Sequence, residues 1–288
     1  GSRLFKHTLD NCISHYLEVT LNRDKKALQK SFTTKSELTP QQMAYAVEDT
    51  TYLSPLHERQ LTVLEEKGLM KVYRLEMRLL PVLVKMESLG CLVDVKAWHE
   101  TLREWETKKR DIVRELDAEY MRLYPFVLFG NLNYSSPKQL IAFFKSLGLP
   151  APTKDGVRVE GQRKVPKKES VDEGALENYR NDHPNSPVDK FIDLLLQYRQ
   201  YDKLLSTYGE SFLATLDENN RVHTTYTQTS TATGRLSSKA PNLQNIPKTQ
   251  SGEGGELRKF FMSADGYELI TSGRSSAEVV LAADRSKD

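Results

Sequence analysis

The densest group of polar side chains in the 288-residue chain lies between positions 231 and 247. Arg235 supplies a planar fork of hydrogen-bond donors, and the glycine before it lets the backbone approach a ligand closely. Asn242, Gln244 and Asn245 add amide side chains within a few residues. Amides and an arginine at this density suit hydrogen bonding to the acceptors that every base pair presents in the minor groove. The pattern predicts binding to duplex nucleic acid without sequence preference.

The local charge is compatible with that prediction. The whole chain carries 41 Lys+Arg and 39 Asp+Glu, a net charge of +2, which argues against a protein that is basic throughout. Residues 221–250, however, contain basic residues and many Ser/Thr hydroxyls but no acidic residue. A surface that binds phosphates needs this combination of positive charge and neutral donors. The alternative is a hydroxyl-rich strand-and-loop region that merely lacks acids, and composition alone does not separate the two.

Other kinds of chemistry find little support. The six histidines are far apart and lack metal-ligand spacing. The sequence contains no P-loop, no G-x-S-x-G motif and no Cys/His nucleophile arrangement. Cys12 and Cys91 are too few for a disulfide framework and fit a reducing compartment. No apolar run of membrane-spanning length and no signal peptide is present.

Helices must position most of these residues. Hydrophobic periodicity and start signals predict a helix that begins near Thr39-Pro40, then helices over 71–89, 95–123, 137–147 and from about 186 to 216. The apolar stripe of the 95–123 helix is expected to pack on a neighbouring helix rather than to bind a partner. Strands are expected within 221–233 and as a pair within 259–272. The expected fold class is therefore mainly α with a terminal β portion, an α+β chain.

The segment TATGRLSSKAPNLQNIP, at positions 231–247, resembles almost letter for letter the segment that leads into the palm of family A DNA polymerases, the DNA polymerase I type. KLLSTY at 203–208 resembles the end of that family's thumb helix, and LLPVLVKMESLGCLVDVKAW at 79–98 resembles the start of its polymerase region. Upstream, the segment 38–49 resembles the third motif of the 3′–5′ exonuclease in its Y-x-x-x-D form.

This resemblance implies an incomplete DNA polymerase I-like fold with long thumb helices and the first palm strands. Residues 1–65 would be the C-terminal part of a 3′–5′ exonuclease-like domain. Residues 66–216 would form a helical thumb region, and residues 217–288 the N-terminal part of the palm. The source compartment would be the cytoplasm with the nucleoid, the host cytoplasm for a viral protein, or an organelle.

Site residues follow from the same resemblance. Arg235 would enter the minor groove at the primer terminus, and the thumb would contact backbone phosphates. The implied DNA-binding residues are Arg235, Asn242, Gln244, Asn245, Lys203, Ser206, Thr207, Gln228, Lys164, Lys167 and Lys168. In the exonuclease part, Asp49 would be a metal-binding carboxylate and Tyr45 would orient the attacking water. Glu278 would exclude ribonucleotides by occupying the place of a 2′-OH.

The sequence departs from the family pattern at the first palm motif, D-Y-S-Q-I-E-L-R. The aligned segment 273–280 reads GRSSAEVV, so Gly273 replaces the metal-binding Asp and Arg274 replaces the Tyr. A glycine side chain cannot ligate a metal ion. The fingers helix, the second palm carboxylate motif and the first two exonuclease motifs have no counterpart in the chain. Mg2+ is therefore expected for the complete enzyme, with its ligands largely absent from this chain.

Three functional hypotheses follow. The first is a part of a DNA-directed DNA polymerase, inactive alone, that binds a DNA primer–template duplex in replication or repair. Its complete form would add deoxynucleotides, with another polypeptide supplying the fingers and the rest of the palm. The second is a catalytically inactive, polymerase-derived DNA-binding module or subunit, which Gly273 favours. The third is a helical scaffold that does not bind DNA.

Overall fold

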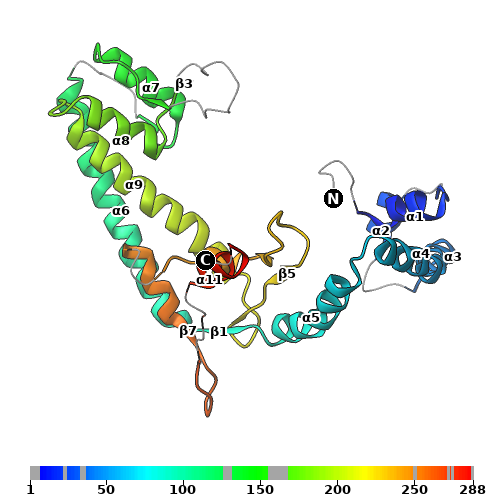
Figure 1. Cartoon of the computed structure of the whole chain (residues 1–288). Coiled ribbons are helices and arrows are strands. Elements are labelled where there is room, and N and C mark those ends of the chain that lie inside the picture. The colour runs from blue at the N-terminus through cyan, green and yellow to red at the C-terminus, as the bar shows by residue number, and fades with distance from the viewer. Residues whose placement is uncertain are drawn as a thin grey trace. The chain divides into compact units, whose positions relative to one another are not determined.

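Helices make up most of the chain, with small sheets between them (Figure 1). The computed structural model describes residues 7–21, 25–32, 37–125, 132–154, 168–248, 252–270, 273 and 276–286. The chain divides into two compact units, Gly1–Met86 and Glu87–Asp288. The expected fold class is confirmed. None of the described helices combines the length and apolar character that crossing a membrane requires.

The first unit is helical in its described part. Its elements are α1 (Leu9–Leu17), α2 (Lys25–Ser31), α3 (Pro40–Thr51), α4 (Leu53–Glu66) and most of α5 (Met70–Leu89). A capping box opens α3, because Thr39 Oγ1 accepts from the Gln42 N–H at 3.2 Å and Gln42 Oε1 accepts from the Thr39 N–H at 2.8 Å. The predicted helix start at Thr39-Pro40 is thus confirmed.

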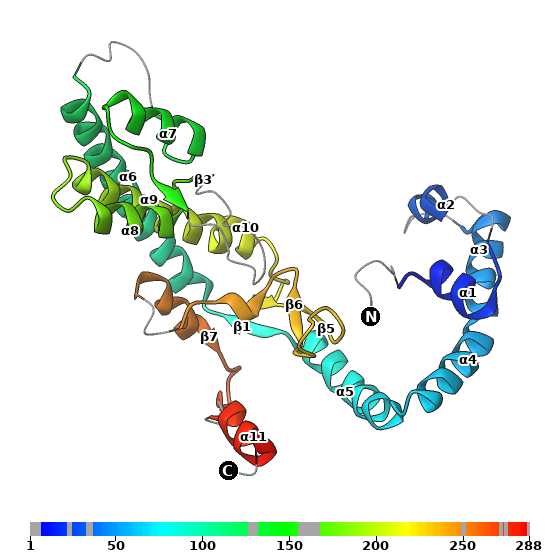
Figure 2. The ribbon, with the colours of Figure 1, turned by 45° about the horizontal axis from the view of Figure 1, so that its top comes forward.

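Two long helices form the centre of the second unit. α6 (Val95–Leu123) and α9 (Asp189–Tyr208) lie side by side in both views (Figures 1 and 2). Their facing sides bury a continuous apolar seam, so the predicted stripe of α6 packs on a helix as expected. The most buried members of the seam are Trp98, Leu102, Trp105 and Leu116 of α6 and Phe191, Ile192 and Leu195 of α9.

A smaller group of elements covers one end of this helix pair. It consists of α7 (Pro137–Ser146), β2 (Thr153–Lys154), β3 (Lys168–Glu169) and α8 (Glu173–Asp182). The Phe143 and Phe191 rings, 4.8 Å apart, join this group to α9, and the Phe144 and Tyr179 rings, 5.3 Å apart, join α7 to α8 within it. Ser136 caps α7 through its side chain, as the sequence predicts.

At the other end of the helix pair, the chain breaks at Gly209. The sequence predicts one helix to about residue 216, but α9 ends at Tyr208, and a separate turn, α10 (Glu210–Leu213), follows. A side chain at Gly209 would place its Cβ 2.2 Å from the Leu205 carbonyl oxygen, so only glycine fits this break. The break lets the Phe212 ring stack on Trp98, with ring centroids 4.6 Å apart.

A three-stranded antiparallel sheet joins distant parts of the second unit. β1 (Cys91–Val93) is central, between β4 (Arg221–Val222) and β7 (Phe261–Met262). The sheet and the helix seam share one core, which includes residues on both sides of position 216. The division into 1–65, 66–216 and 217–288 remains a prediction.

A hairpin and two short 3-10 helices complete the described fold (Figure 2). β5 (Thr225–Thr227) pairs antiparallel with β6 (Ser237–Lys239), and η1 (Leu243–Asn245) and η2 (Gly252–Phe260) follow. Of the two strands predicted within 259–272, the described residues contain only β7. The chain then turns, with the Tyr267 N–H donating to Ala264 O at 3.0 Å. α11 (Ala277–Ser286) ends the described part.

Candidate nucleic-acid interface

The loop of the β5–β6 hairpin presents Arg235 at the surface. Gly234, directly before it, has a φ of +73°, a left-handed conformation that favours glycine. The hydroxyl of Thr231 donates to the Arg235 carbonyl oxygen at 2.6 Å and stabilises the turn. The glycine therefore shapes the turn that exposes Arg235. Gln228, half-buried, opens the same loop.

Three polar side chains connect this hairpin to η1. Ser238 is only 2% exposed, and its hydroxyl donates to Asn242 Oδ1 at 3.0 Å and accepts from the Gln244 N–H at 3.3 Å. The Gln244 carboxamide accepts from the Ser238 N–H and donates to the Leu236 carbonyl oxygen, both at 3.2 Å. Asn242 also caps η1, because its Oδ1 accepts from the Gln244 N–H at 3.0 Å. The predicted DNA-binding amides at 242 and 244 thus have internal partners.

A groove of about 930 Å³ runs along α9 and ends at η1. Lys203 and Thr207, one helical turn apart, line it together with Asn245. The structure therefore brings together predicted residues from two segments. Ser206 is exposed on the same helix, where its hydroxyl donates to the Lys203 carbonyl oxygen at 3.1 Å, but it is not among the lining residues. Acidic Glu173 and Asp193 line the same groove.

Two contacts hold the η1 end of the groove in place. The Tyr208 hydroxyl donates to the Asn245 carbonyl oxygen at 2.8 Å, and burial raises the pKa of this phenol, so it stays a neutral donor. The Arg258 guanidinium donates to the carbonyl oxygens of Ile246 and Pro247 at 2.8 and 2.7 Å. Neither Tyr208 nor Arg258 is among the predicted site residues. Their side chains donate to backbone carbonyl oxygens of the 245–247 segment, and a sequence pattern does not reveal contacts of this kind.

The sequence resemblance places the basic residues between Lys154 and Lys168 at the tip of the thumb, and ion pairing partly neutralises the described part of this segment. Lys168 is exposed in β3, opposite Lys154 of β2. Lys154 pairs with Asp172 at 2.9 Å, and its hydrogen bond is the main reason that the pKa of this carboxyl is lowered. The backbone N–H of Ala175, at the start of α8, adds to this lowering. Lys164 and Lys167 lie outside the described residues.

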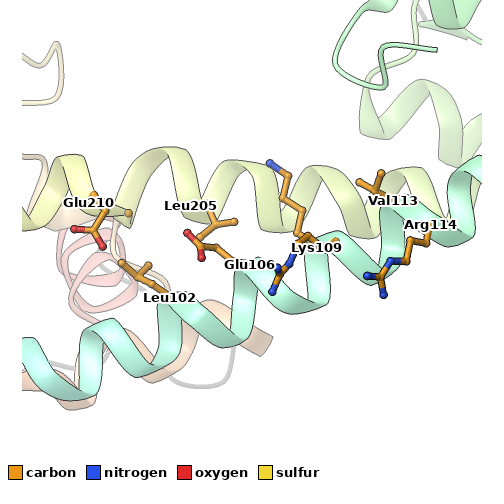
Figure 3. Close-up of a pocket in the computed structure, with 9 residues that line it drawn as sticks. Leu102, Glu106, Lys109, Val113, Arg114, Leu205 and Glu210 are labelled. Atoms are coloured by element: carbon orange, nitrogen blue, oxygen red, sulfur yellow. The ribbon is translucent and has the colours of Figure 1, made fainter. Parts of the chain in front are cut away.

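A second hollow, of about 620 Å³, lies between α6 and α9 (Figure 3). Its apolar lining comes from Leu102, Val113 and Leu205, and charged side chains that include Lys109 surround them. Lys109 pairs with Asp202 of α9 at 2.7 Å and so ties the two helices together. The sequence patterns do not predict this hollow, because its residues lie on two helices distant in the chain.

The residues predicted to act in catalysis are spread over separate elements. Tyr45 and Asp49 lie one turn apart on α3 of the first unit, and Tyr45 is 7% exposed beside the Phe32 ring. Glu278 belongs to α11, and its side chain lies outside the described residues. Gly273 is exposed before that helix.

Comparison with known proteins identifies the family. The model of DNA polymerase family A matches residues 99–288. This chain belongs to DNA polymerase family A. The predicted resemblance is therefore confirmed. Family A relatives in bacteria include DNA polymerase I of Treponema pallidum, 34% identical over 85% of this chain and 22% of the relative. The thermostable DNA polymerase I of Thermus aquaticus is 34% identical over 77% of this chain and 24% of its own length.

A solved family A structure shares the fold. The polymerase domain of Pol1 from M. smegmatis, in complex with DNA primer–template and dNTP, superimposes with a TM-score of 0.72 and 26% sequence identity. The match covers 98% of this chain and 43% of that chain. The chain thus spans under half of that structure and about a quarter of the curated relatives' length. The predicted DNA polymerase I-like fold is confirmed over this span.

Family A DNA polymerases depend on Mg2+, and the described residues do not fit such a site. Two-metal phosphoryl transfer needs carboxylates that hold both ions. In the described part of the chain, no group of three or more His, Cys, Asp or Glu side chains is arranged to hold a metal ion. Gly273, which the sequence resemblance aligns with the family's metal-binding Asp, has no side-chain ligand. No catalytic step through a metal can be derived from these residues.

Proposed function

We propose that this chain is part of a DNA-directed DNA polymerase and that it binds the primer–template duplex. The observation that carries the proposal is the groove along α9. There Lys203 and Thr207 meet Asn245, next to the hairpin that presents Arg235. Cationic and neutral donors in one hollow suit a phosphate backbone, and the adjoining arginine and amide suit minor-groove acceptors.

The proposed contacts divide into two kinds. Lys203, Ser206 and Thr207 of α9 bind phosphate oxygens, and this part of the chain acts as the thumb. Arg235 and Asn245 bind base acceptors in the minor groove at the primer end, with Gln228 beside them on the hairpin loop. The exposed Lys168 adds positive charge at the tip of the unit. Because these groups recognise features common to all base pairs, the binding is independent of sequence.

Nucleotide addition is proposed only for the complete polymerase. Glu278 would exclude ribonucleotides there, and another polypeptide or segment would supply the fingers, the remaining palm and the metal-binding carboxylates. Tyr45 and Asp49 would be a remnant of the 3′–5′ exonuclease. A second candidate function is a catalytically inactive DNA-binding module, which Gly273 favours because it removes a metal ligand.

A binding titration tests the proposal. A fluorescein-labelled primer–template is titrated with the chain at low salt, and the affinity is then measured as salt rises. We expect binding that weakens with salt, with a slope of about 0.9 per phosphate contact. Lys203→Ala should reduce that slope by about 1, since it removes one phosphate contact. No binding at low salt would refute both candidate functions.

Primer extension separates the two candidates. The chain is mixed with primer–template, Mg2+ and all four deoxynucleotides, alone and with its native co-purifying chains. Extension by the reconstituted mixture but not by the chain alone supports the polymerase part. Extension by the chain alone would show that its own residues complete the site. Binding without extension in either mixture supports the inactive module.

A further inference from the structure

The outer edge of β6 is closed by a side chain instead of a strand. In the β5–β6 ladder Tyr226 lies opposite Ser238. The Tyr226 N–H donates to the Glu87 carboxylate and so points away from β6. Because opposite residues in an antiparallel pair share one orientation, the Ser238 N–H must likewise point away from β5.

Gln244 occupies this outer edge. Its Oε1 accepts from the Ser238 N–H, and its Nε2 donates to the Leu236 carbonyl oxygen, each at 3.2 Å. Residues two apart in a strand present these groups on the same edge, so the carboxamide bonds them as the N–H and C=O of one residue in a neighbouring parallel strand would. The backbone N–H of Gln244 donates to the buried Ser238 hydroxyl at 3.3 Å. Ser238 and Gln244 are thus joined by two hydrogen bonds, one with each residue as the donor.

The surrounding atoms make this arrangement specific. The Ser238 hydroxyl, at 2% exposure, cannot contact a ligand, yet it joins both Asn242 and Gln244. The Gln244 carboxamide supplies one acceptor and one donor to the strand edge in the required order. The loop that carries Arg235 begins and ends on the two strands that this edge closure stabilises.

We propose that Gln244 is a positioning residue: with Ser238 it closes the edge of β6 and thereby fixes the hairpin that presents Arg235 to DNA. The proposal rests on the duplex-binding function proposed above. Its consequence is that Gln244 contributes to DNA affinity through Ser238 rather than only through a contact of its own. Ser238, which the resemblance did not single out, becomes part of the DNA-binding apparatus.

Amide hydrogen exchange in the DNA-free chain tests the edge closure by itself. In Gln244→Ala the Ser238 N–H should exchange about tenfold faster, since loss of one hydrogen bond is worth about that factor. The Lys239 N–H, which the register directs toward Thr225, should change little and serves as the internal control. An unchanged Ser238 exchange rate would overturn the proposal.

A double-mutant cycle then tests the coupling to DNA. Duplex affinity is measured for Ser238→Ala, Gln244→Ala, the double variant and the control Ser237→Ala. We expect each single variant to weaken binding about three- to tenfold, the double variant to lose little more, and the control to stay near the parent. A double variant that loses the product of both factors would show independent contacts and refute the positioning role.

The outcomes remain separable from the proposed function. Gln244 is exposed, so Gln244→Ala keeps the fold even where the buried Ser238→Ala does not. Absence of duplex binding by the unaltered chain would refute the proposed function and with it the DNA role of Gln244. The exchange measurement would still decide whether the carboxamide closes the strand edge.

Discussion

The Tyr208 hydroxyl donates a hydrogen bond to the Asn245 carbonyl oxygen at 2.8 Å, and this bond joins the end of α9 to η1. The donor and acceptor belong to two segments that form one groove, so the bond fixes the distance between the proposed phosphate-binding helix and the proposed minor-groove residues. Tyr208 is 5% exposed, so no water replaces the phenol easily.

We expect Tyr208→Phe to lower the free energy of unfolding by about 0.5–1.5 kcal/mol, the usual net value of one such bond. Duplex affinity should fall as well, because Asn245 loses its anchor. Urea unfolding and DNA titration measure the two effects. Tyr267→Phe, at a residue that is 76% exposed, is the control and should change neither quantity. Equal stability of parent and Tyr208→Phe would contradict the anchoring role.

Replacing Trp98 with phenylalanine should lower the free energy of unfolding more than the same replacement at an equally buried tryptophan. Its Nε1–H donates to the Tyr208 carbonyl oxygen at 2.8 Å, across 110 positions of sequence. Trp98→Phe removes the donor and leaves a buried acceptor, which should cost about 1–3 kcal/mol beyond the change in volume. Trp105→Phe is the matched control, because Trp105 is 1% exposed and its ring nitrogen makes no hydrogen bond within the described part of the chain. The free energy of unfolding is measured by calorimetry. Equal losses in Trp98→Phe and Trp105→Phe would show that the Trp98 hydrogen bond does not contribute to stability.

Arg235→Ala should weaken duplex binding by about 1–3 kcal/mol. The side chain is exposed, and the turn beneath it depends on Gly234 and on backbone atoms of residue 235. Arg74→Ala, at an exposed arginine of the first unit, is the control for loss of charge. An affinity that does not change at Arg235 would remove it from the proposed interface.

His223 connects the end of α5 to the β4 turn. Its Nδ1 lies 2.7 Å from the Glu87 carbonyl oxygen and its Nε2 lies 3.2 Å from Asp217 Oδ2, so both ring nitrogens face acceptors. Only the charged imidazolium donates from both positions. The bond to Glu87 first, and then the one to Asp217, raise the pKa of His223, although the cationic Arg221 nearby opposes the shift.

This raised pKa predicts a loss of stability with increasing pH. The contribution is complete below the unfolded value of about 6.5 and disappears as pH rises through the higher folded value. Urea unfolding from about pH 5 to 9 should show this decline in the parent. The His223→Gln variant should lack it, and Asp217→Asn should shift the decline to lower pH. The same pH dependence in parent and His223→Gln would count against the prediction.

Local sequence signals predicted several elements, among them α3 and α6. The capping box at Thr39 and the apolar stripe of α6 depend on residues within a turn or two of one another, so periodicity and cap residues suffice. The same signals overran the end of α9, because the apolar pattern continues past Gly209, where the helix breaks and a Cβ would lie 2.2 Å from the Leu205 carbonyl oxygen. Of the second strand predicted within 259–272, the described residues 267–270 form no strand, and positions 271–272 lie outside the described residues.

By itself the sequence determined the family, several of the helices, and which polar residues are candidates for the interface. Only the tertiary structure placed Lys203 beside Asn245, and only it showed that the Gln244 carboxamide bonds the edge of β6. The physical reason is the range of the interactions. Helix signals repeat every few residues along the chain, whereas a groove or a closed strand edge depends on where the backbone returns after a long separation.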